Sequence, residues 1–199
     1  IRGSVRDMVI IGRHNSYNGR EWTRDEIEAG KLSKWLLAYM TVGEAQKSEW
    51  YWNPAYNAHP PSWAIGTNPY WSNNVYAELW NGDWQAILHQ HIDRVIDQGF
   101  DGAFLDVADS YWYPGYPGGP EWYNKWEAAL TVCALAQHAR SRNPEFKIVV
   151  NNALDLFWMV PNYMDCIDGT VIEGLWWKDG TTPRDAFYHN QKIGELAYH

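Results

Sequence analysis

Short apolar runs alternate along the chain with longer stretches in which apolar residues recur at helical spacing. The apolar runs have the length of β-strands, and several are followed at once by polar residues. They occupy residues 7–12, 35–40, 100–106, 146–150 and 169–172. Strands that alternate with helices form parallel sheets in α/β proteins. The pattern therefore predicts a single α/β domain over residues 1–199, built on a parallel sheet.

The helical stretches have recognisable beginnings and ends. A short helix is expected near residues 23–30, where the spacing of a capping box occurs. Asp83 is expected to cap an amphipathic helix that Gly99 ends. A long helix is expected over residues 120–142, because it opens with a Pro-Glu pair and is followed by Asn-Pro. A last helix is expected from about residue 183 to 196.

Two segments lack this regularity. Residues 50–81 are rich in Trp, Pro and Asn and show little periodicity, and residues 110–120 are rich in Gly, Pro and aromatic side chains. Loops of this length inside a compact domain usually carry function. We therefore expect both segments to lie near a binding site.

Charge and aromatic content narrow the class of ligand. The formal net charge is -8, which disfavours nucleic acid and anionic lipid and favours a cationic partner. The chain has no apolar run long enough for a transmembrane helix, and residues 1–4 do not resemble a signal peptide. The 14 Trp and 13 Tyr exceed what a core ordinarily uses, because their polar groups need partners. Such side chains are suited to stacking on the flat faces of sugars.

Polar side chains gather where the predicted strands end. In a parallel α/β fold, the active site forms at the carboxyl ends of the strands. A helix cap or a turn explains a single polar residue at a strand end, but polar residues at four strand ends favour a functional cluster. The residues concerned are Tyr39, Glu44, Asp106, Asp109, Asn151, Asn152 and Glu173.

Paired carboxylates can hydrolyse a glycosidic bond, because one protonates the leaving oxygen while the other attacks the sugar or activates water. The sequence contains no phosphate-binding glycine loop, no His-Glu-x-x-His metal motif and no Gly-x-Ser-x-Gly elbow. His91 falls on the apolar side of its helix and is interpreted as structural. Cys133 is interpreted as a buried thiol, and a single disulfide with Cys166 is left open. No metal or cofactor is predicted.

At this point the motifs resemble a known family. The segment 37–44 (Leu-Ala-Tyr-Met-Thr-Val-Gly-Glu) and the segment 99–106 (Gly-Phe-Asp-Gly-Ala-Phe-Leu-Asp) resemble those of the endo-α-1,4-polygalactosaminidase family, glycoside hydrolase family 114. Residues 149–152 and 170–174 fit the same pattern downstream. The resemblance runs from about residue 7 to 196, and its specificity comes from the two blocks occurring together.

The resemblance implies a TIM-type (β/α)8 barrel, secretion or cell-surface location, and cleavage of cationic galactosamine polymers found in exopolysaccharides and biofilms. It places the catalytic pair on Asp106, expected as nucleophile, and Glu173, expected as acid/base. The residues expected to surround the sugar are Tyr39, Glu44, Asp109, Tyr111, Asn151 and Asn152, with Trp112, Trp176 and Trp177 as stacking platforms.

The chain departs from the family pattern in two ways. Arg13 follows the first strand, where the family commonly has an acidic residue, and an arginine there would disfavour a cationic sugar. The visible strands correspond to about the second to the sixth of the barrel, so the barrel is expected to be incomplete. Either the chain is part of a longer protein, or its open edges are covered by altered packing or self-association.

Three functions remain open on the sequence. The first is a hydrolase of α-1,4-linked galactosamine polysaccharide. The second is a hydrolase of another α-linked glycan, which Arg13 suggests. The third is a non-catalytic carbohydrate-binding protein derived from a truncated barrel. Only in the first two cases do Asp106 and Glu173 carry turnover, so substitutions at these carboxylates separate an enzyme from a lectin.

Overall fold

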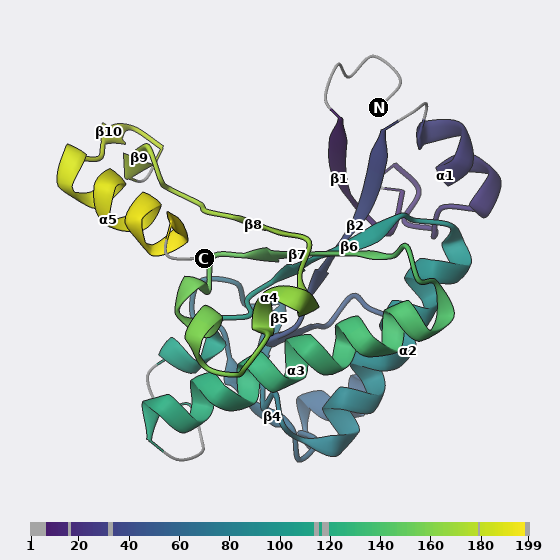
Figure 1. The fold of residues 1–199 in the computed structure, drawn as a ribbon. Coiled ribbons are helices and arrows are strands. Elements are labelled where there is room, and N and C mark those ends of the chain that lie inside the picture. The colour runs from purple at the N-terminus through teal and green to yellow at the C-terminus, as the bar shows by residue number, and fades with distance from the viewer. Residues whose placement is uncertain are drawn as a thin grey trace.

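A computed structural model of the chain describes residues 7–15, 17–31, 34–113, 116, 120–178 and 180–197 (Figure 1). The expectation for residues 1–4 and part of the expected loop 110–120 lie outside these ranges. No helix among the described residues is long and apolar enough to cross a membrane.

A parallel sheet of five strands forms the centre of the fold, as the sequence predicts. Its order is β1-β2-β6-β7-β8, and every neighbouring pair is parallel. The strands are β1 (Met8–Gly12), β2 (Trp35–Thr41), β6 (Gly102–Asp106), β7 (Lys147–Asn151) and β8 (Gly169–Val171). The two edges of this sheet are β1 and β8. The register pairs Thr41 with Asp106, so the carboxyl ends of β2 and β6 lie side by side.

Two long helices, α2 (Gly82–Gln98) and α3 (Glu121–Arg142), pack against one face of the sheet (Figure 1). The shorter α1 (Arg24–Lys31) precedes β2, and a capping box opens it: Thr23 Oγ1 accepts a bond from the Glu26 amide, and Glu26 accepts one from the Thr23 amide.

The expected cap of α2 at Asp83 is wrong by two residues. The side chain of Asn81 caps α2 by accepting a bond from the Asp83 amide, which therefore lies inside the first turn.

The two faces of the sheet differ in how they are packed. Residues of β2 that face the helices, such as Leu36 and Met40, belong to the large core beneath α2 and α3. Alternate residues face the other way. There Leu37, Phe104 and Val149 form a small separate cluster. In a closed barrel this second face is the interior, so the large core is the layer between the strands and the outer helices.

The segment expected to be a long irregular loop, residues 50–81, contains two short strands, which pair with a third strand just before the segment to form an antiparallel sheet. The order is β3-β5-β4, with β3 (Glu44–Gln46), β4 (Ala64–Thr67) and β5 (Asn74–Ala77), and a short 3-10 helix η1 (Pro54–Asn57) lies between β3 and β4. Because β3 begins three residues after β2 ends, this small sheet stands directly beside the carboxyl ends of the central strands.

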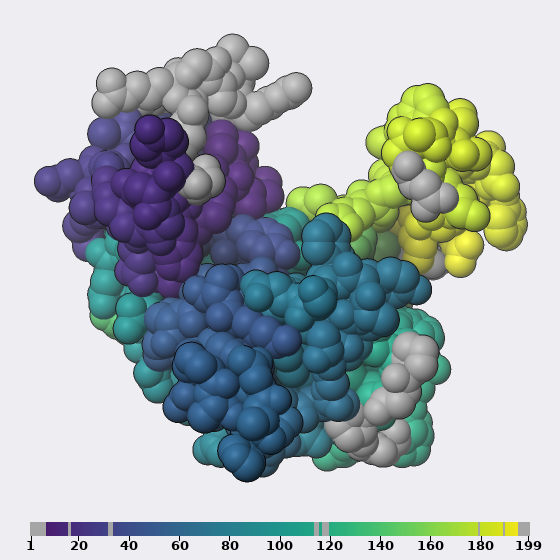
Figure 2. Space-filling model, turned by 180° about the vertical axis from the view of Figure 1, so that it is seen from behind, coloured from purple at the N-terminus to yellow at the C-terminus, as the bar shows by residue number. Residues whose placement is uncertain are grey.

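The last part of the chain forms an arm. It consists of the hairpin β9 (Trp177–Lys178) and β10 (Thr182–Pro183) followed by α5 (Ala186–Ala197), which starts three residues later than expected. Figures 1 and 2 show this arm, in yellow-green to yellow, projecting from one side of the body, and Figure 2 shows a hollow between the arm and the purple N-terminal part of the fold.

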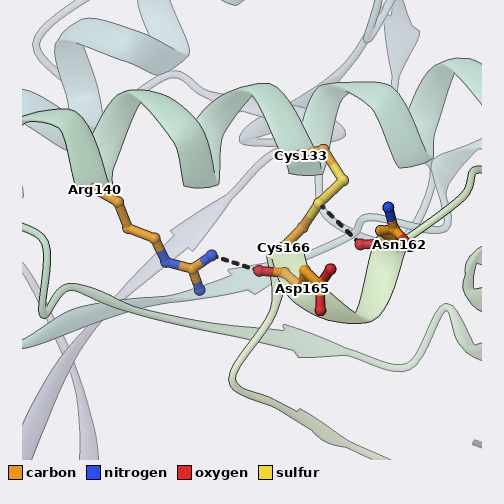
Figure 3. The surroundings of a disulfide bond; sticks show 5 residues. All are labelled: Cys133, Arg140, Asn162, Asp165 and Cys166. Atoms are coloured by element: carbon orange, nitrogen blue, oxygen red, sulfur yellow. Dashed lines mark hydrogen bonds between the residues drawn. A yellow bond between two sulfur atoms is a disulfide. The ribbon is translucent and has the colours of Figure 1, made fainter.

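The expectation of a buried free thiol at Cys133 is wrong, because a disulfide joins Cys133 to Cys166 (Figure 3). The bond links α3 to the short helix α4 (Tyr163–Cys166). Arg140, two turns further along α3, donates a hydrogen bond of 2.7 Å to the carbonyl oxygen of Asp165. The disulfide and this hydrogen bond together fasten the segment between β7 and β8 to the outside of α3.

Candidate active site

Asp106 ends β6 and accepts hydrogen bonds from three donors. Tyr39 of the neighbouring strand β2 donates its hydroxyl to Oδ2 over 2.5 Å. Asn151, the last residue of β7, donates its side-chain amide to Oδ1 over 2.8 Å, and the backbone amide of Val107 donates to the same oxygen over 2.8 Å. Three adjacent strand ends thus hold one carboxylate. Hydrogen bonds of this kind stabilise the ionised form and fix its orientation.

The turn after Asp106 is strained and tightly packed. Val107 has a φ of 59°, a left-handed conformation that a β-branched side chain rarely adopts. Its carbonyl oxygen and the Ser110 side chain lie so close to Gly43 that a Cβ on this glycine would overlap them. Only a glycine lets the loop after β2 approach the turn after β6 this closely.

Glu173 follows β8 by two residues and is exposed. Its backbone amide donates a hydrogen bond of 2.9 Å to the side chain of Asn152. Asn152 itself has a φ of 53°, a conformation that asparagine tolerates better than most residues. The carboxylate of Glu173 has no hydrogen-bonding partner within the described part of the chain, so Asn152 positions the backbone and leaves the acid group accessible.

Asp106 and Glu173 line the same cavity, of about 520 Å³, which we call the acidic cavity. Four carboxylates face it, and none of its lining residues is a Lys, Arg or His. Burial, and the hydrogen bond to Asp106, raise the pKa of Tyr39 well above its ordinary value. The lining residues are Tyr39, Glu44, Gln46, Asn68, Trp71, Asn74, Asp106, Val107, Asp109, Tyr113, Asn152 and Glu173.

Glu44 is the most deeply buried carboxylate of the group, with 1% of its surface exposed. It is the first residue of β3, and the side-chain amides of Asn68 and Asn74 donate to its two oxygens over 2.5 and 2.7 Å. Tyr113 stacks on Tyr76 with ring centroids 3.8 Å apart and places its hydroxyl 3.5 Å from Glu44. The small antiparallel sheet therefore supplies a fixed negative charge at one side of the cavity.

Asp109 lies at the boundary of the acidic cavity and a second cavity of about 480 Å³. Burial, with the negative charges of Asp106, Asp155 and Glu173 nearby, raises the pKa of Asp109 to about 6. We call the second space the Trp112 cavity. Its lining residues are Asp109, Trp112, Lys125, Asn152, Ala153, Leu154, Asp155, Trp158, Ile172, Tyr188 and Lys192.

The structure brings together most, but not all, of the residues selected from the sequence. Tyr111 is buried and lines neither cavity, because its hydroxyl donates to Asp155 over 2.5 Å. Trp176 and Trp177 are exposed on the arm and also line neither cavity. The predicted sugar contact is therefore not supported for these three residues. Asn151 contacts Asp106 from a buried position rather than lining the cavity.

Other lining residues were not found from the sequence. Trp71, which is 69% exposed, stands in the turn between β4 and β5 and lines the acidic cavity. Lys125 of α3, and Asp155 and Trp158 of the 3-10 helix η3 (Leu154–Trp158), line the Trp112 cavity. The Trp-rich composition of residues 50–81 pointed to a binding role for residues such as Trp71. The spacing of Lys125, Asp155 and Trp158 in the sequence does not distinguish them from ordinary helix residues.

Arg13 does not face the site. Its side chain is buried and paired with Glu21 and Glu49, each at 2.8 Å, and its Nε donates to His91. Burial lowers the pKa of His91 to about 4, so this histidine is a neutral acceptor in a structural network, as expected. The two carboxylates neutralise Arg13, and it therefore gives no reason to exclude a cationic sugar.

The described residues contain no group of three or more His, Cys, Asp or Glu side chains arranged to hold a metal ion. The chemistry available at the site is that of the carboxylates, the tyrosine hydroxyls and the amides of asparagine. One carboxyl group held by three donors faces the same cavity as an accessible second one. Such a pair can divide the roles of nucleophile or base and of proton donor.

Comparisons with known proteins agree with this chemistry. A model of the glycoside hydrolase family GH114 matches residues 21–191. A protein of Deinococcus radiodurans is 34% identical over 181 residues, covering 90% of this chain and 56% of that protein. One of Methanocaldococcus jannaschii is 27% identical over 190 residues, covering 94% of this chain and 54% of that protein. The chain spans about half the length of these curated relatives.

Solved structures of TIM-barrel glycosidases share the fold. The structure of Aspergillus fumigatus Ega3 in complex with galactosamine has a TM-score of 0.73 at 15% identity, over 98% of this chain and 67% of Ega3. The glycoside hydrolase domain of Pseudomonas aeruginosa PelA has a TM-score of 0.71 at 17% identity, over 98% of this chain and 72% of that domain. The expected fold class is thereby confirmed: the five parallel strands match part of such barrels.

Proposed function

Because the chain belongs to glycoside hydrolase family GH114, we propose that it hydrolyses α-1,4-linked galactosamine polysaccharide with Asp106 and Glu173 as its catalytic carboxylates. The observation that carries the proposal is the acidic cavity, where both carboxylates lie at the carboxyl ends of parallel strands. Active sites of barrel enzymes form at this end of the sheet.

Asp106 is suited to the role of nucleophile. The three hydrogen bonds from Tyr39, Asn151 and the Val107 amide stabilise its negative charge and hold both oxygens in place. A carboxylate fixed in this way needs no rearrangement before it approaches the anomeric carbon. The strained turn at Val107 supports the same reading, since backbone strain commonly persists at functional sites.

Glu173 is suited to the role of acid/base. Its side chain is exposed and without a hydrogen-bonding partner among the residues described, so its carboxyl group is accessible to a glycosidic oxygen. A protonated carboxyl can then donate to the glycosidic oxygen as the bond breaks.

The charge of the acidic cavity supports an amino sugar as substrate. Four carboxylates without a lining cation attract the ammonium group of a galactosamine unit, and the overall charge of -8 attracts a cationic polymer over longer distances. The complex of Ega3 with galactosamine concerns a protein of the same fold and is consistent with this choice. Trp71 at the rim offers an exposed ring for stacking.

We also propose that the protein acts outside the cytosol, as a secreted or cell-surface enzyme. The disulfide between Cys133 and Cys166 supports this location, since such bonds persist in oxidising compartments. Self-association through the edges of the five-stranded sheet stays a prediction as well. A measurement of mass in solution tests it, and a strict monomer over a range of concentrations would count against it.

Release of new reducing ends from α-1,4-polygalactosamine tests the proposed function. Wild-type protein, Asp106→Asn, Glu173→Gln and the control Glu145→Gln, an exposed glutamate outside both cavities, are compared with folding checked by circular dichroism. Release is expected from the wild type and the control, and each cleft variant should lose at least about 100-fold in rate. Equal rates in all four proteins would refute the assignment, and binding without release from any of them would favour a lectin.

A further inference from the structure

The two cavities of the cleft adjoin each other, because Asp109 and Asn152 line both of them. They differ in charge. We propose that they bind neighbouring sugars of different kinds: a sugar with a free amine in the acidic cavity, and an N-acylated sugar in the Trp112 cavity. The inference rests on the proposed function and adds the pattern of substitution that the substrate must have around the cleaved bond.

The acidic cavity selects for positive charge. Its lining contains Glu44, Asp106, Asp109 and Glu173, and no basic side chain lies among the lining residues to balance them. Glu44 is held from two sides by amides, which cannot neutralise it. An ammonium group that enters this space meets attraction from several directions, whereas an N-acyl group leaves the carboxylates without a counter-charge.

The Trp112 cavity has a different balance. Its two carboxylates, Asp109 and Asp155, are matched by two lysines, Lys125 and Lys192. The ammonium of Lys125 lies 2.9 Å from Asp155 and 2.5 Å from Glu121, so the charge of Asp155 is already compensated by the protein. A substrate ammonium in this cavity would have to approach the like charges of two lysines, and of the two carboxylates only Asp109, which the acidic cavity shares, is left to attract it.

The shape of the Trp112 cavity favours an N-acylated ring. Trp112 is 55% exposed, and Lys125 Nζ stands 4.2 Å from its ring centroid. The lysine therefore steadies the indole through a cation–π contact, and the exposed part of the ring can stack on a sugar. An acyl methyl group adds apolar area to this contact, and the acyl oxygen can accept the third hydrogen of the Lys125 ammonium.

Cleavage then occurs beside a boundary between unlike sugars. Asp106 and Glu173 line the acidic cavity, and the boundary residues Asp109 and Asn152 stand between them and Trp112. A polymer that runs through both cavities places an amine-bearing unit on one side of this boundary and an N-acylated unit on the other. Partly N-acetylated polygalactosamine should therefore be a better substrate than either the fully deacetylated or the fully acetylated polymer.

The test is the identity of the sugars at the new chain ends. Randomly and partly N-acetylated α-1,4-polygalactosamine is digested, and mass spectrometry identifies the unit at each new reducing and non-reducing end. One kind of end should be enriched in galactosamine and the other in N-acetylgalactosamine. Cleavage with the same unit enriched at both ends, or with no enrichment, would overturn this inference and leave the proposed function standing. Failure to cleave any polymer would overturn both.

Variants of Lys125 test the physical cause. Lys125→Gln removes the compensating charge from Asp155, so the enrichment of N-acetylgalactosamine should fall by roughly tenfold. Lys125→Arg keeps the charge and the contact with Trp112 and should preserve the enrichment. The matched control is Lys178→Gln, an exposed lysine on the arm that lines neither cavity. Unchanged enrichment in Lys125→Gln would contradict the role given to this cavity.

Discussion

Removing one charge from the acidic cavity should stabilise the protein, and the size of the effect should depend on pH. Asp109 has a pKa raised to about 6, mainly by burial, from an ordinary value of 3.8. Between these values the folded state binds more protons than the unfolded state, so stability falls as pH rises through this window. Above about pH 6, the folded state carries the full free-energy cost of an ionised Asp109.

The shift of roughly two units sets the magnitude. Asp109→Asn should raise the free energy of unfolding by about 3 kcal/mol at pH 7.5 and by only about 1 kcal/mol at pH 4.5. The same substitution should weaken cleavage of polygalactosamine, since the lost charge faces the substrate in both cavities. Stability and activity would then change in opposite directions, as happens where a site is held in a strained or repulsive arrangement.

Urea unfolding at the two pH values measures the effect. The control is Asp7→Asn, an exposed aspartate just before β1 and outside both cavities, which should change the free energy of unfolding by less than about 0.5 kcal/mol. If Asp109→Asn has the same free energy of unfolding as the wild type at both pH values, or a lower one at pH 7.5, the reasoning that burial penalises an ionised Asp109 is refuted.

Three further predictions follow from contacts described above. Tyr39→Phe removes the hydroxyl that donates to Asp106 and should lower kcat on polygalactosamine by roughly 10- to 100-fold without changing the unfolding temperature; an unchanged kcat would show that this bond does not orient the carboxylate. The double change Cys133→Ser with Cys166→Ser should lower the free energy of unfolding by about 4 kcal/mol, because the disulfide closes a loop with a sequence separation of 33. Reduction of the wild type by dithiothreitol should give the same loss, and a loss below about 1 kcal/mol would contradict this prediction. Gly43→Ala should displace the turn at Val107 and cost about 1–3 kcal/mol in urea unfolding together with most of the activity, whereas wild-type stability would mean that the loop yields easily.

The parallel sheet could be predicted because its signals are local. Each strand is a short apolar run with a polar residue at its end, and the long helix is bounded by Pro120 and by Asn143. The catalytic candidates followed from the same logic, since parallel strands bring their carboxyl ends together. Glu44, Asp106 and Glu173 line one cavity although they lie far apart in the sequence.

The parts that could not be predicted depend on contacts between distant residues. The strands β3, β4 and β5 have only three or four residues each, too few for a visible alternation of apolar and polar positions. The disulfide depends on how α4 lies against α3, which the spacing of two cysteines does not reveal. Tyr111 follows a strand end like its neighbours, but its ring turns into the protein and its hydroxyl reaches Asp155 of a later segment.

The cap of α2 shows how close two local signals can be. Asn81 and Asp83 are both good capping residues, and each is followed by apolar residues at helical spacing. The structure selects Asn81, and Asp83 becomes the acidic residue of the first turn, where it interacts favourably with the helix dipole. Only the three-dimensional path of the preceding chain decides between them.

The central claim is that Asp106 and Glu173 divide the chemistry of glycosidic bond cleavage, and a substrate whose leaving group needs no proton tests it most directly. We would measure dinitrophenol release from the 2,4-dinitrophenyl α-glycoside of an α-1,4-linked galactosamine oligomer. Glu173→Gln should still release dinitrophenol from this substrate while failing on the polymer, because only the polymer needs an acid. Asp106→Asn should fail on both. Release by Asp106→Asn at the wild-type rate, or equal loss by both variants on the activated substrate, would contradict the assignment.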